Sequence, residues 1–273
     1  MKTASNPRLW NLGLGTWNLK TLLCLSLLTA AALANNLPAD RTSLEGRELA
    51  RELTAIEPSQ SLTNTGVLVI RDKQRGEVRV PVRMTIQLGA DGWTTTYQTI
   101  TTDTNHLAEL VIHQAPARPN RYEIRAGKAA ASSAEAQPAA LPVTGLMTPF
   151  AGSDFWIADL GLEFLRWPQQ RLLRKELRRG QSCNVLESAQ TNATAGGYTR
   201  VVSWIDMDTG GIVEAEAYDA AGKLLKVFKP ISFQKLGGRW EVKKLEMANR
   251  RDGTRTRLEF ELLDKVDALK AKP

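Results

Sequence analysis

The region from Asn184 to Leu263 repeats one pattern, in which a short run rich in β-branched and aromatic residues is followed by a turn that contains glycine. Turns this tight join antiparallel neighbours, whereas parallel strands need crossovers of a dozen or more residues. The pattern therefore predicts an antiparallel meander, which any fold of this chain has to contain. The predicted strands are Asn184–Ser188, Tyr198–Asp206, Ile212–Asp219, Leu224–Phe233, Trp240–Met247 and Arg255–Leu263.

The N-terminal half shows the same strand pattern after one helix. Ser43–Glu57 has leucines at roughly helical spacing and is followed by Pro58, so it predicts an amphipathic helix that needs a partner surface. Glu77–Leu88 alternates with period two, which indicates a strand with one apolar face. Pro81 within this run favours an edge strand or a bulge, because proline lacks the amide hydrogen. Further strands are predicted at Leu62–Ile70, Trp93–Thr102, Leu107–His113 and Tyr122–Arg125.

The stretch Thr148–Gln170 holds five of the seventeen aromatic residues of the chain, together with the carboxylates of Asp154 and Asp159. Ser153 is placed to cap a helix that Pro168 ends, so the sequence predicts a short, interrupted helix lying on other structure. Large rings next to fixed acids are costly to leave in water or to bury unpaired. The stretch is therefore interpreted as an aromatic plug of the core or as a lid over a ligand cavity.

Two further segments bear on the organisation of the chain. Ala126–Leu141 is rich in alanine, serine and proline, which is typical of a flexible loop, either within one sheet or at a domain boundary. Leu172–Arg179 is compatible with a strand or with the tail of the preceding helix, and periodicity alone does not separate the two.

The first 34 residues have the features of a cleaved signal peptide. Lys2, Arg8 and Lys20 precede or flank the fourteen-residue, mostly apolar run Thr21–Ala34, and Asp40 is the first acid of the chain. A run of this length is too short to span a bilayer, which takes roughly twenty apolar residues. We therefore expect export and a mature chain that begins near Asn35. Removing the three basic residues lowers the formal net charge from +7 to +4.

The remaining basic residues are scattered apart from one cluster after the aromatic stretch. This cluster is interpreted as a solvated face or as a basic edge directed at acidic lipid headgroups. No recognition motif for nucleic acid accompanies it, so a nucleic-acid partner is not expected. Its members are Arg166, Arg171, Arg174, Lys175, Arg178 and Arg179.

An enzyme should bring together reactive groups, and the sequence offers few of them. His106 and His113 are seven residues apart beside one predicted strand and therefore face opposite sides. Cys183 is the only cysteine left after cleavage, either a buried thiol or one activated by the basic cluster. Asp154 and Asp159 are the pair that could act as general acid and base. We expect neither catalysis nor a metal or other cofactor, and we expect a monomer.

One predicted strand indicates what the sheet encloses. In Ile212–Tyr218 one face carries Val213, Ala215 and Ala217, and small residues on a curved sheet leave room. Ten or so strands with an amphipathic helix and an aromatic segment predict a mainly β protein with some α structure. Its fold is expected to be a strongly curved antiparallel sheet, an open half-barrel, covered by a few helices.

Several motifs in fixed order carry a resemblance to a known superfamily. They are Asp154-Phe155-x-x-x-Asp159-Leu160, then Cys183-x-Val185-Leu186-Glu187, Tyr198-x-Arg200-Val201-Val202-x-Trp204-Ile205-Asp206, Tyr218-Asp219-x-x-Gly222-Lys223-x-x-Lys226 and Glu246-Met247. The order resembles the outer-membrane lipoprotein-sorting, or lipoprotein-carrier (LolA-like), superfamily. It covers Ser153 to Leu263 well, and the N-terminal half only through its layout of a helix followed by strands.

The resemblance implies a single half-barrel domain, residues 35–273, in an exported protein that carries or senses acyl chains. On this model Phe155, Trp156 and Leu160 belong to a lid and Trp204 to the sheet, while Lys223 and Lys226 lie on the strand after a hairpin. The expected function is a periplasmic or outer-membrane-associated protein that holds lipid or lipoprotein acyl chains in an apolar cavity. The expected ligand-binding residues are Phe155, Trp156, Leu160, Phe164, Trp204, Val213, Ala215 and Ala217.

Two other functions remain open from the sequence. The same half-barrel with a collapsed cavity would serve as a protein-interaction or envelope-sensor module with an envelope protein as partner. Large side chains on the concave face would favour this module, and small ones would favour the carrier. A hydrolase acting on envelope polymers would require a polar cleft around Asp154 and Asp159.

Overall fold

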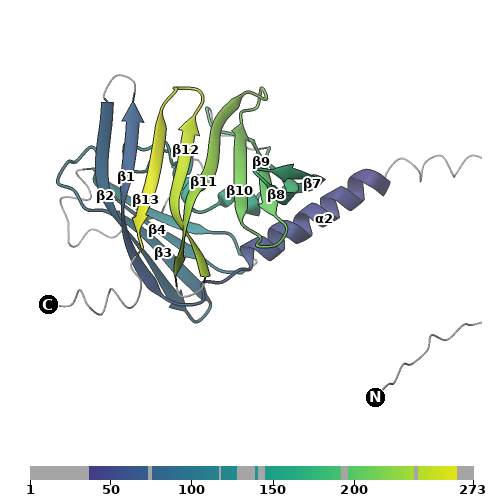
Figure 1. The fold of residues 1–273 in the computed structure, drawn as a ribbon, viewed down its shortest axis with the longest axis horizontal. Helices are drawn as coiled ribbons and strands as arrows, with labels where there is room; N and C mark the ends of the chain where they lie inside the picture. Colours follow the sequence, from purple (N-terminus) through teal and green to yellow (C-terminus); the bar gives the residue numbers. More distant parts are fainter. Residues whose placement is uncertain are drawn as a thin grey trace, which may run out of the picture. The chain divides into compact units, whose positions relative to one another are not determined.

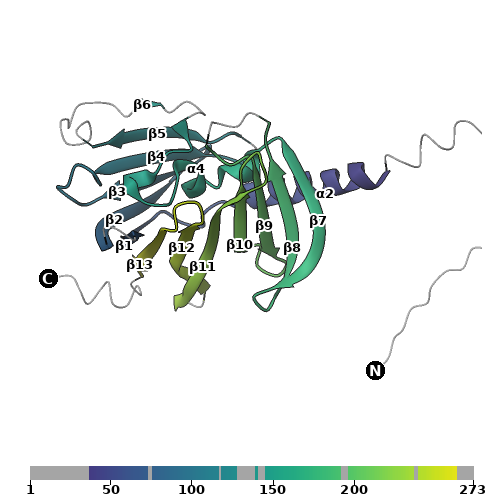
Figure 2. The ribbon, with the colours of Figure 1, turned by 90° about the horizontal axis from the view of Figure 1, so that it is seen from above.

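The fold is built on one antiparallel sheet that is not closed into a barrel (Figures 1 and 2). The computed structural model describes residues 37–72, 76–116, 118–127, 139–140, 145–191, 196–236 and 239–262. Within these residues, thirteen strands form the sheet in the order β6-β5-β4-β3-β2-β1-β13-β12-β11-β10-β9-β8-β7. The predicted fold class, a strongly curved open sheet with few helices, is confirmed.

The sheet consists of two meanders that meet in its centre, where β1 pairs with β13. The first meander comprises β1 (Leu62–Asp72), β2 (Gly76–Gly89), β3 (Gly92–Thr99), β4 (Ala108–Gln114), β5 (Arg121–Ala126) and β6 (Ala139–Ala140). The second comprises β7 (Gln169–Arg178), β8 (Gln181–Ala189), β9 (Arg200–Asp206), β10 (Ile212–Tyr218), β11 (Leu224–Leu236), β12 (Arg239–Asn249) and β13 (Arg255–Glu261).

The two edge strands, β6 and β7, follow one another in the sequence. The connection between them therefore has to run from one edge of the curved sheet to the other. Figure 2 shows its short helix α4 (Ile157–Leu160) inside the curve of the sheet. The remaining regular parts of the connection are the 3₁₀ turns η2 (Phe150–Gly152) and η3 (Glu163–Arg166). Topology thus places the aromatic stretch on the inner face of the sheet.

Helix α2 (Leu37–Thr54) packs on the same inner face near β7 to β10. Ala50 is buried, and Leu49 and Leu53 contact the apolar cluster beneath the second meander. Gly46 permits the close approach, because a Cβ atom there would lie 2.6 Å from the backbone of Arg171 in β7. The predicted amphipathic helix is confirmed, with its start before Ser43 and its end at Thr54.

The apolar core of the inner face falls into two clusters. The first lies under β1 to β5, β12 and β13 and includes Leu68, Leu110 and Ile112, all at most 1% exposed. The second lies under β8 to β11 and includes Leu186, Tyr198 and Ala215. Full burial of one large apolar side chain contributes about 1.5–3 kcal/mol, so these two clusters are the main source of stability.

The structure corrects two expectations about local elements and decides one that the sequence left open. Pro81 lies in β2, an internal strand between β1 and β3. Its carbonyl accepts a hydrogen bond from the Ile100 amide at 2.7 Å. Its nitrogen, which has no hydrogen to donate, points to the same side, beyond the end of β3. Leu172–Arg178 belongs to strand β7 and not to a helix, which decides between the two alternatives. Ser153 does not cap a helix: α4 begins at Ile157, and the Asp159 carboxylate accepts the Trp156 amide at 2.7 Å.

Some predictions lie outside the described residues. The signal peptide, residues 1–34, and most of the Ala126–Leu141 loop are among them. The described residues from Ala39 onward belong to one compact unit by their contacts. Among the described helices, none combines the length and apolar character that crossing a membrane requires.

Candidate functional site

The connection from Thr148 to Pro168, called the aromatic segment below, is held in shape by its own backbone. The Phe150 amide donates to the Phe155 carbonyl at 2.8 Å, and the Ile157 amide donates to the Thr148 carbonyl at 3.1 Å. Ala151 and Leu162 adopt left-handed backbone conformations with φ of 52° and 48°. These turns fold the segment tightly and direct its side chains toward the sheet.

The aromatic segment contributes to both apolar clusters. Phe150, Phe155 and Ile157 are at most 1% exposed and belong to the first cluster. Trp156, Phe164 and Trp167 belong to the second. Successive residues Phe155 and Trp156 therefore point into different clusters, and the segment occupies the inner face between them.

Lys226 of β11 is the polar centre of this packing and is only 2% exposed. Its ammonium donates to the Asp154 carbonyl at 2.7 Å and to Asp159 Oδ2 at 3.2 Å. It also lies 3.5 Å from the centre of the Trp156 ring, which is a cation–π contact. One lysine of the sheet thus bonds the aromatic segment at one backbone carbonyl and one carboxylate and stacks on its tryptophan.

The Asp154 side chain fastens the same segment to β13. Its Oδ1 accepts a hydrogen bond from Thr254 at 2.5 Å, and its Oδ2 accepts one from Thr256 at 2.8 Å. The Asp154 amide donates to the Thr256 hydroxyl at 2.9 Å. Because this carboxylate is 7% exposed and fully engaged, it is a structural anchor and not a free general base.

A ring stack completes the site on the side of the second meander. Trp156 and Tyr198 are stacked with centroids 5.1 Å apart and an interplanar angle of 4°, and Trp167 lies 5.9 Å from Tyr198. The Tyr198 hydroxyl donates to Asp159 Oδ1. Asp159 therefore joins Lys226, Tyr198 and the start of α4 in one buried network.

Between the aromatic segment and the second meander lies a cavity of about 20 Å³. This is room for about one water molecule and not for an acyl chain. The lining is mostly apolar and comprises Asp159, Leu162, Phe164, Val201, Ala215, Ala217, Lys226, Phe228 and Met247. In this conformation the aromatic rings fill the space that the small residues of β10 leave.

The structure separates the eight expected ligand-binding residues into two groups. Phe155, Trp156, Leu160, Phe164, Ala215 and Ala217 lie on the inner face, in or against the two clusters. Trp204 and Val213 lie instead in a third cluster on the outer face, with Cys183 and Val185. Val213 was expected beside Ala215, but the register of β10 against β9 shifts between Ile212 and Glu214, which reverses its side. Neither residue reaches the inner cavity.

The sequence did not predict which polar residues hold the aromatic segment. Lys226, Tyr198 and Thr256 had no assigned role in holding the segment, yet each is at most 2% exposed. The signal for Lys226 and Thr256 was available, because each occupies an inward position of an alternating strand. A lysine at such a position predicts a buried partner.

The other candidate groups do not assemble into a site. The His106 ring contacts the Ala151 carbonyl at 2.9 Å, whereas the His113 ring contacts Glu123 at 3.2 Å. Within the described residues, no three His, Cys, Asp or Glu side chains are grouped to hold a metal. Burial raises the pKa of the Cys183 thiol, so the basic cluster does not activate it.

Apart from Arg166 in η3, the basic cluster lies on β7 and directly after it, and it is largely engaged. Arg171 pairs with Glu187 at 2.8 Å, and Arg178 pairs with Glu214 and lies 4.2 Å from the Trp204 ring centre. Arg179 donates to the Pro230 carbonyl at 2.8 Å. These contacts agree with the solvated-face interpretation better than with a free basic edge.

Stability should depend on pH through Lys226. Burial lowers the pKa of its ammonium from 10.5 to about 8, against the opposing effect of Asp159. Between these values the unfolded chain holds the proton and the folded chain does not, so the free energy of unfolding rises with pH. Burial and the Asp159 charge raise the pKa of Tyr198 well above 10, so stability falls once tyrosines of the unfolded chain ionise.

We therefore expect the wild-type chain to gain on the order of 1–3 kcal/mol from Lys226 between pH 8 and 10, and to lose stability above pH 10. Urea unfolding at half-unit pH intervals measures this. The Lys226→Met variant serves as the control. The raised pKa of Cys183 lowers the free energy of unfolding of both proteins as pH rises, and the difference between the two profiles removes this effect. Parallel profiles for the two proteins would contradict the assignment.

The comparisons with known proteins agree with this architecture. A family model described as "Uncharacterized protein" matches residues 136–272. No curated protein matches the sequence. Crystal structures with a similar fold include the following three. A DUF1329 family protein from Desulfovibrio piger has a TM-score of 0.65 and 19% identity over 82% of this chain and 92% of its own. A putative outer membrane lipoprotein-sorting protein domain from Vibrio parahaemolyticus has a TM-score of 0.65 and 22% identity, over 84% of this chain and 97% of its own. A LolA superfamily protein from Nitrosomonas europaea has a TM-score of 0.55 and 17% identity, over 85% of this chain and 98% of its own.

These likenesses, all below 25% identity, establish the fold. The half-barrel that the resemblance implied is therefore confirmed as architecture, over both halves of the chain and not only from Ser153 onward.

Proposed function

We propose that this protein is an exported envelope protein that binds lipid or lipoprotein acyl chains. It belongs to the family whose model matches residues 136–272, and it has the fold of LolA-superfamily domains. The bound acyl chain would lie between the inner face of the sheet and the aromatic segment. One observation carries the proposal: the second apolar cluster is a layer of rings over small residues, with Ala215 and Ala217 at its base.

The conformation described above is then the closed, unliganded one. An acyl chain would displace the rings of Trp156 and Phe164 from β10 and take their place. Each buried methylene contributes about 0.8 kcal/mol, which has to offset the contacts that the segment gives up. The Lys226 and Asp154 bonds set part of this cost, because they hold the segment on the sheet.

The first test is native mass spectrometry of the mature chain from Asn35, purified from a bacterial envelope without detergent. Co-purifying phospholipid or acylated peptide, lost in a Trp156→Asp variant, supports the carrier. A mass without ligand that is unchanged when lipids are added contradicts it.

The position of the ligand is tested by a matched pair of variants in β10. Ala215→Val adds bulk to the inner cavity, and we expect it to weaken binding of a fluorescent fatty acid by about tenfold. Val213→Phe adds bulk to the same strand on the outer face and should leave binding within about twofold of wild type. Equal effects of the two substitutions would place the ligand elsewhere. Thermal unfolding of both variants separates loss of binding from loss of fold.

A second function is favoured by the small size of the cavity. With about 20 Å³ free, the inner face is filled by large side chains, as expected for a module that contacts another envelope protein. Crosslinking in the envelope, followed by identification of the partner, tests this module if the lipid experiments give no ligand.

A further inference from the structure

A second groove lies away from the aromatic segment, at the turn between β12 and β13. Its volume is about 450 Å³, and it is open to solvent. The lining residues are Arg71, Ala248, Asn249, Arg250, Gly253, Thr254 and Arg255. Three arginines from the end of β1, the turn and the start of β13 thus surround one groove that contains no acidic side chain in its lining.

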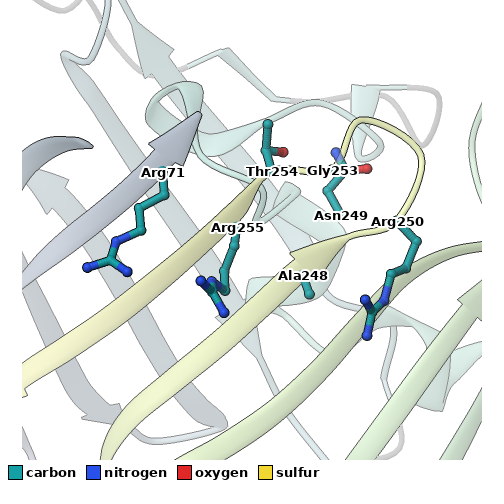
Figure 3. A pocket seen from close by; sticks show the side chains of 7 residues that line it. All are labelled: Arg71, Ala248, Asn249, Arg250, Gly253, Thr254 and Arg255. Atoms are coloured by element: carbon teal, nitrogen blue, oxygen red, sulfur yellow. The ribbon is translucent and has the colours of Figure 1, made fainter. Parts of the chain in front are cut away.

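The three guanidinium groups are directed to one side of the sheet. Figure 3 shows the side chains of Arg71, Arg250 and Arg255 extending from the ribbon in the same direction, while Thr254 points the other way. Alternation explains this: Thr256 faces the inner side, so Arg255 faces outward. The groove therefore opens on the outer face, opposite the aromatic segment.

The neighbouring carboxylates neutralise these arginines only in part. Arg71 pairs with Glu77 at 2.8 Å, whereas Arg255 reaches Glu246 only at 3.8 Å. Glu246 is already held by Arg257 at 2.9 Å and by Lys229 at 3.4 Å. Arg250 has no carboxylate within ion-pair distance in the described part of the chain. The groove consequently keeps an excess of positive charge.

The chemistry of the lining selects a kind of ligand. Guanidinium groups present pairs of N–H donors that match the oxygens of a phosphate, and several of them around one groove hold an anion better than one. The groove is larger than a single phosphate requires. We propose that it binds a phosphate or phosphodiester group, carried either by a lipid headgroup or by a free phosphorylated compound. This inference does not depend on acyl-chain binding at the inner face.

The site is also connected to the aromatic segment through one residue. Thr254 lines the groove and donates to Asp154 Oδ1 at 2.5 Å. A ligand that orders the turn would act on the same turn that anchors the segment.

The probes are inorganic phosphate, sn-glycerol 3-phosphate, and vesicles of phosphatidylglycerol or of phosphatidylcholine, each added to the mature chain. NMR of the arginine Nε–Hε groups locates small phosphates, and vesicle flotation measures lipid binding. We expect the signals of Arg71, Arg250 and Arg255 to shift with at least one phosphate source. Added salt should weaken the binding because the groove is exposed.

The double variant Arg250→Gln/Arg255→Gln should weaken binding by about tenfold or more. The control Arg41→Gln/Arg83→Gln removes the same charge from exposed sites outside the groove and should change binding by less than about twofold. Binding of the small phosphates assigns a free ligand, and binding of phosphatidylglycerol vesicles alone assigns a headgroup. Absence of binding to every probe, or equal loss in both double variants, overturns the proposal. Circular dichroism confirms that each variant is folded.

Discussion

Replacing Lys226 with methionine is expected to lower the free energy of unfolding by about 3–5 kcal/mol. The substitution removes the ammonium that bonds Asp159 at 3.2 Å and the Asp154 carbonyl at 2.7 Å. The Asp159 side chain is 10% exposed, so its charge cannot recover much hydration when its partner is lost. Urea denaturation at pH 7 measures the change.

The rescue experiment distinguishes a charge effect from a packing effect. In Lys226→Met/Asp159→Asn the buried pair is replaced by two neutral groups, and the amide oxygen of the asparagine can still accept from Tyr198 or from the Trp156 amide. We expect this double variant to recover more than half of the lost stability, because it leaves no unpaired charge. A double variant less stable than Lys226→Met would show that the loss comes from packing. Wild-type stability of Lys226→Met itself would show that the lysine does not hold the segment.

Replacing Gly161 with alanine is expected to destabilise the protein by about 3 kcal/mol, which is at the upper end for overpacking. A Cβ atom at this position would lie 2.1 Å from the Tyr122 hydroxyl oxygen. That hydroxyl cannot move freely, because it donates to Glu163 at 2.7 Å and accepts from Asn120 at 3.0 Å. The prediction runs against helix propensity, which favours alanine over glycine. Thermal and urea unfolding test it.

Two controls accompany the Gly161 variant. Gly161→Ala/Tyr122→Phe removes the closest contact and should recover part of the stability, although two ring carbons remain 2.8 Å away. Gly211→Ala meets only the Thr209 hydroxyl at 3.3 Å and should cost little. A Gly161→Ala protein as stable as wild type would mean that the segment shifts away from β5 without loss.

Both predictions concern the same physical question, namely how firmly the aromatic segment is held. Lys226 fixes it from β11, Asp154 fixes it to β13, and Tyr122 packs against Gly161 from β5. Three strands of the sheet thus contribute to its position. If the inner face binds acyl chains, weakening any one of these contacts should also lower the energy needed to open the cavity.

The sequence determined the elements and the class of fold. Period-two alternation and glycine-containing turns located nearly every described strand, because each depends on residues close together in the chain. The motifs from Asp154 to Met247 identified the superfamily fold in the same way. Glu77–Leu88 illustrates the limit. Its alternation located β2, but Pro81 favoured an edge strand or a bulge, and only the termination of β3 explains this proline in an internal strand.

Tertiary structure alone decided which faces and partners are used. Trp204 and Val213 were expected at the cavity, but alternation gives two faces without naming the inner one, and a register shift after Ile212 moved Val213 outward. The hydrogen bonds of the site join residues that are far apart in the sequence. Lys226 and Asp159 are 67 positions apart, and Thr256 and Asp154 are 102 positions apart. Local patterns do not encode such contacts. They arise because the connection between the two edge strands has to cross the inner face of the sheet, where it meets side chains from strands distant in sequence.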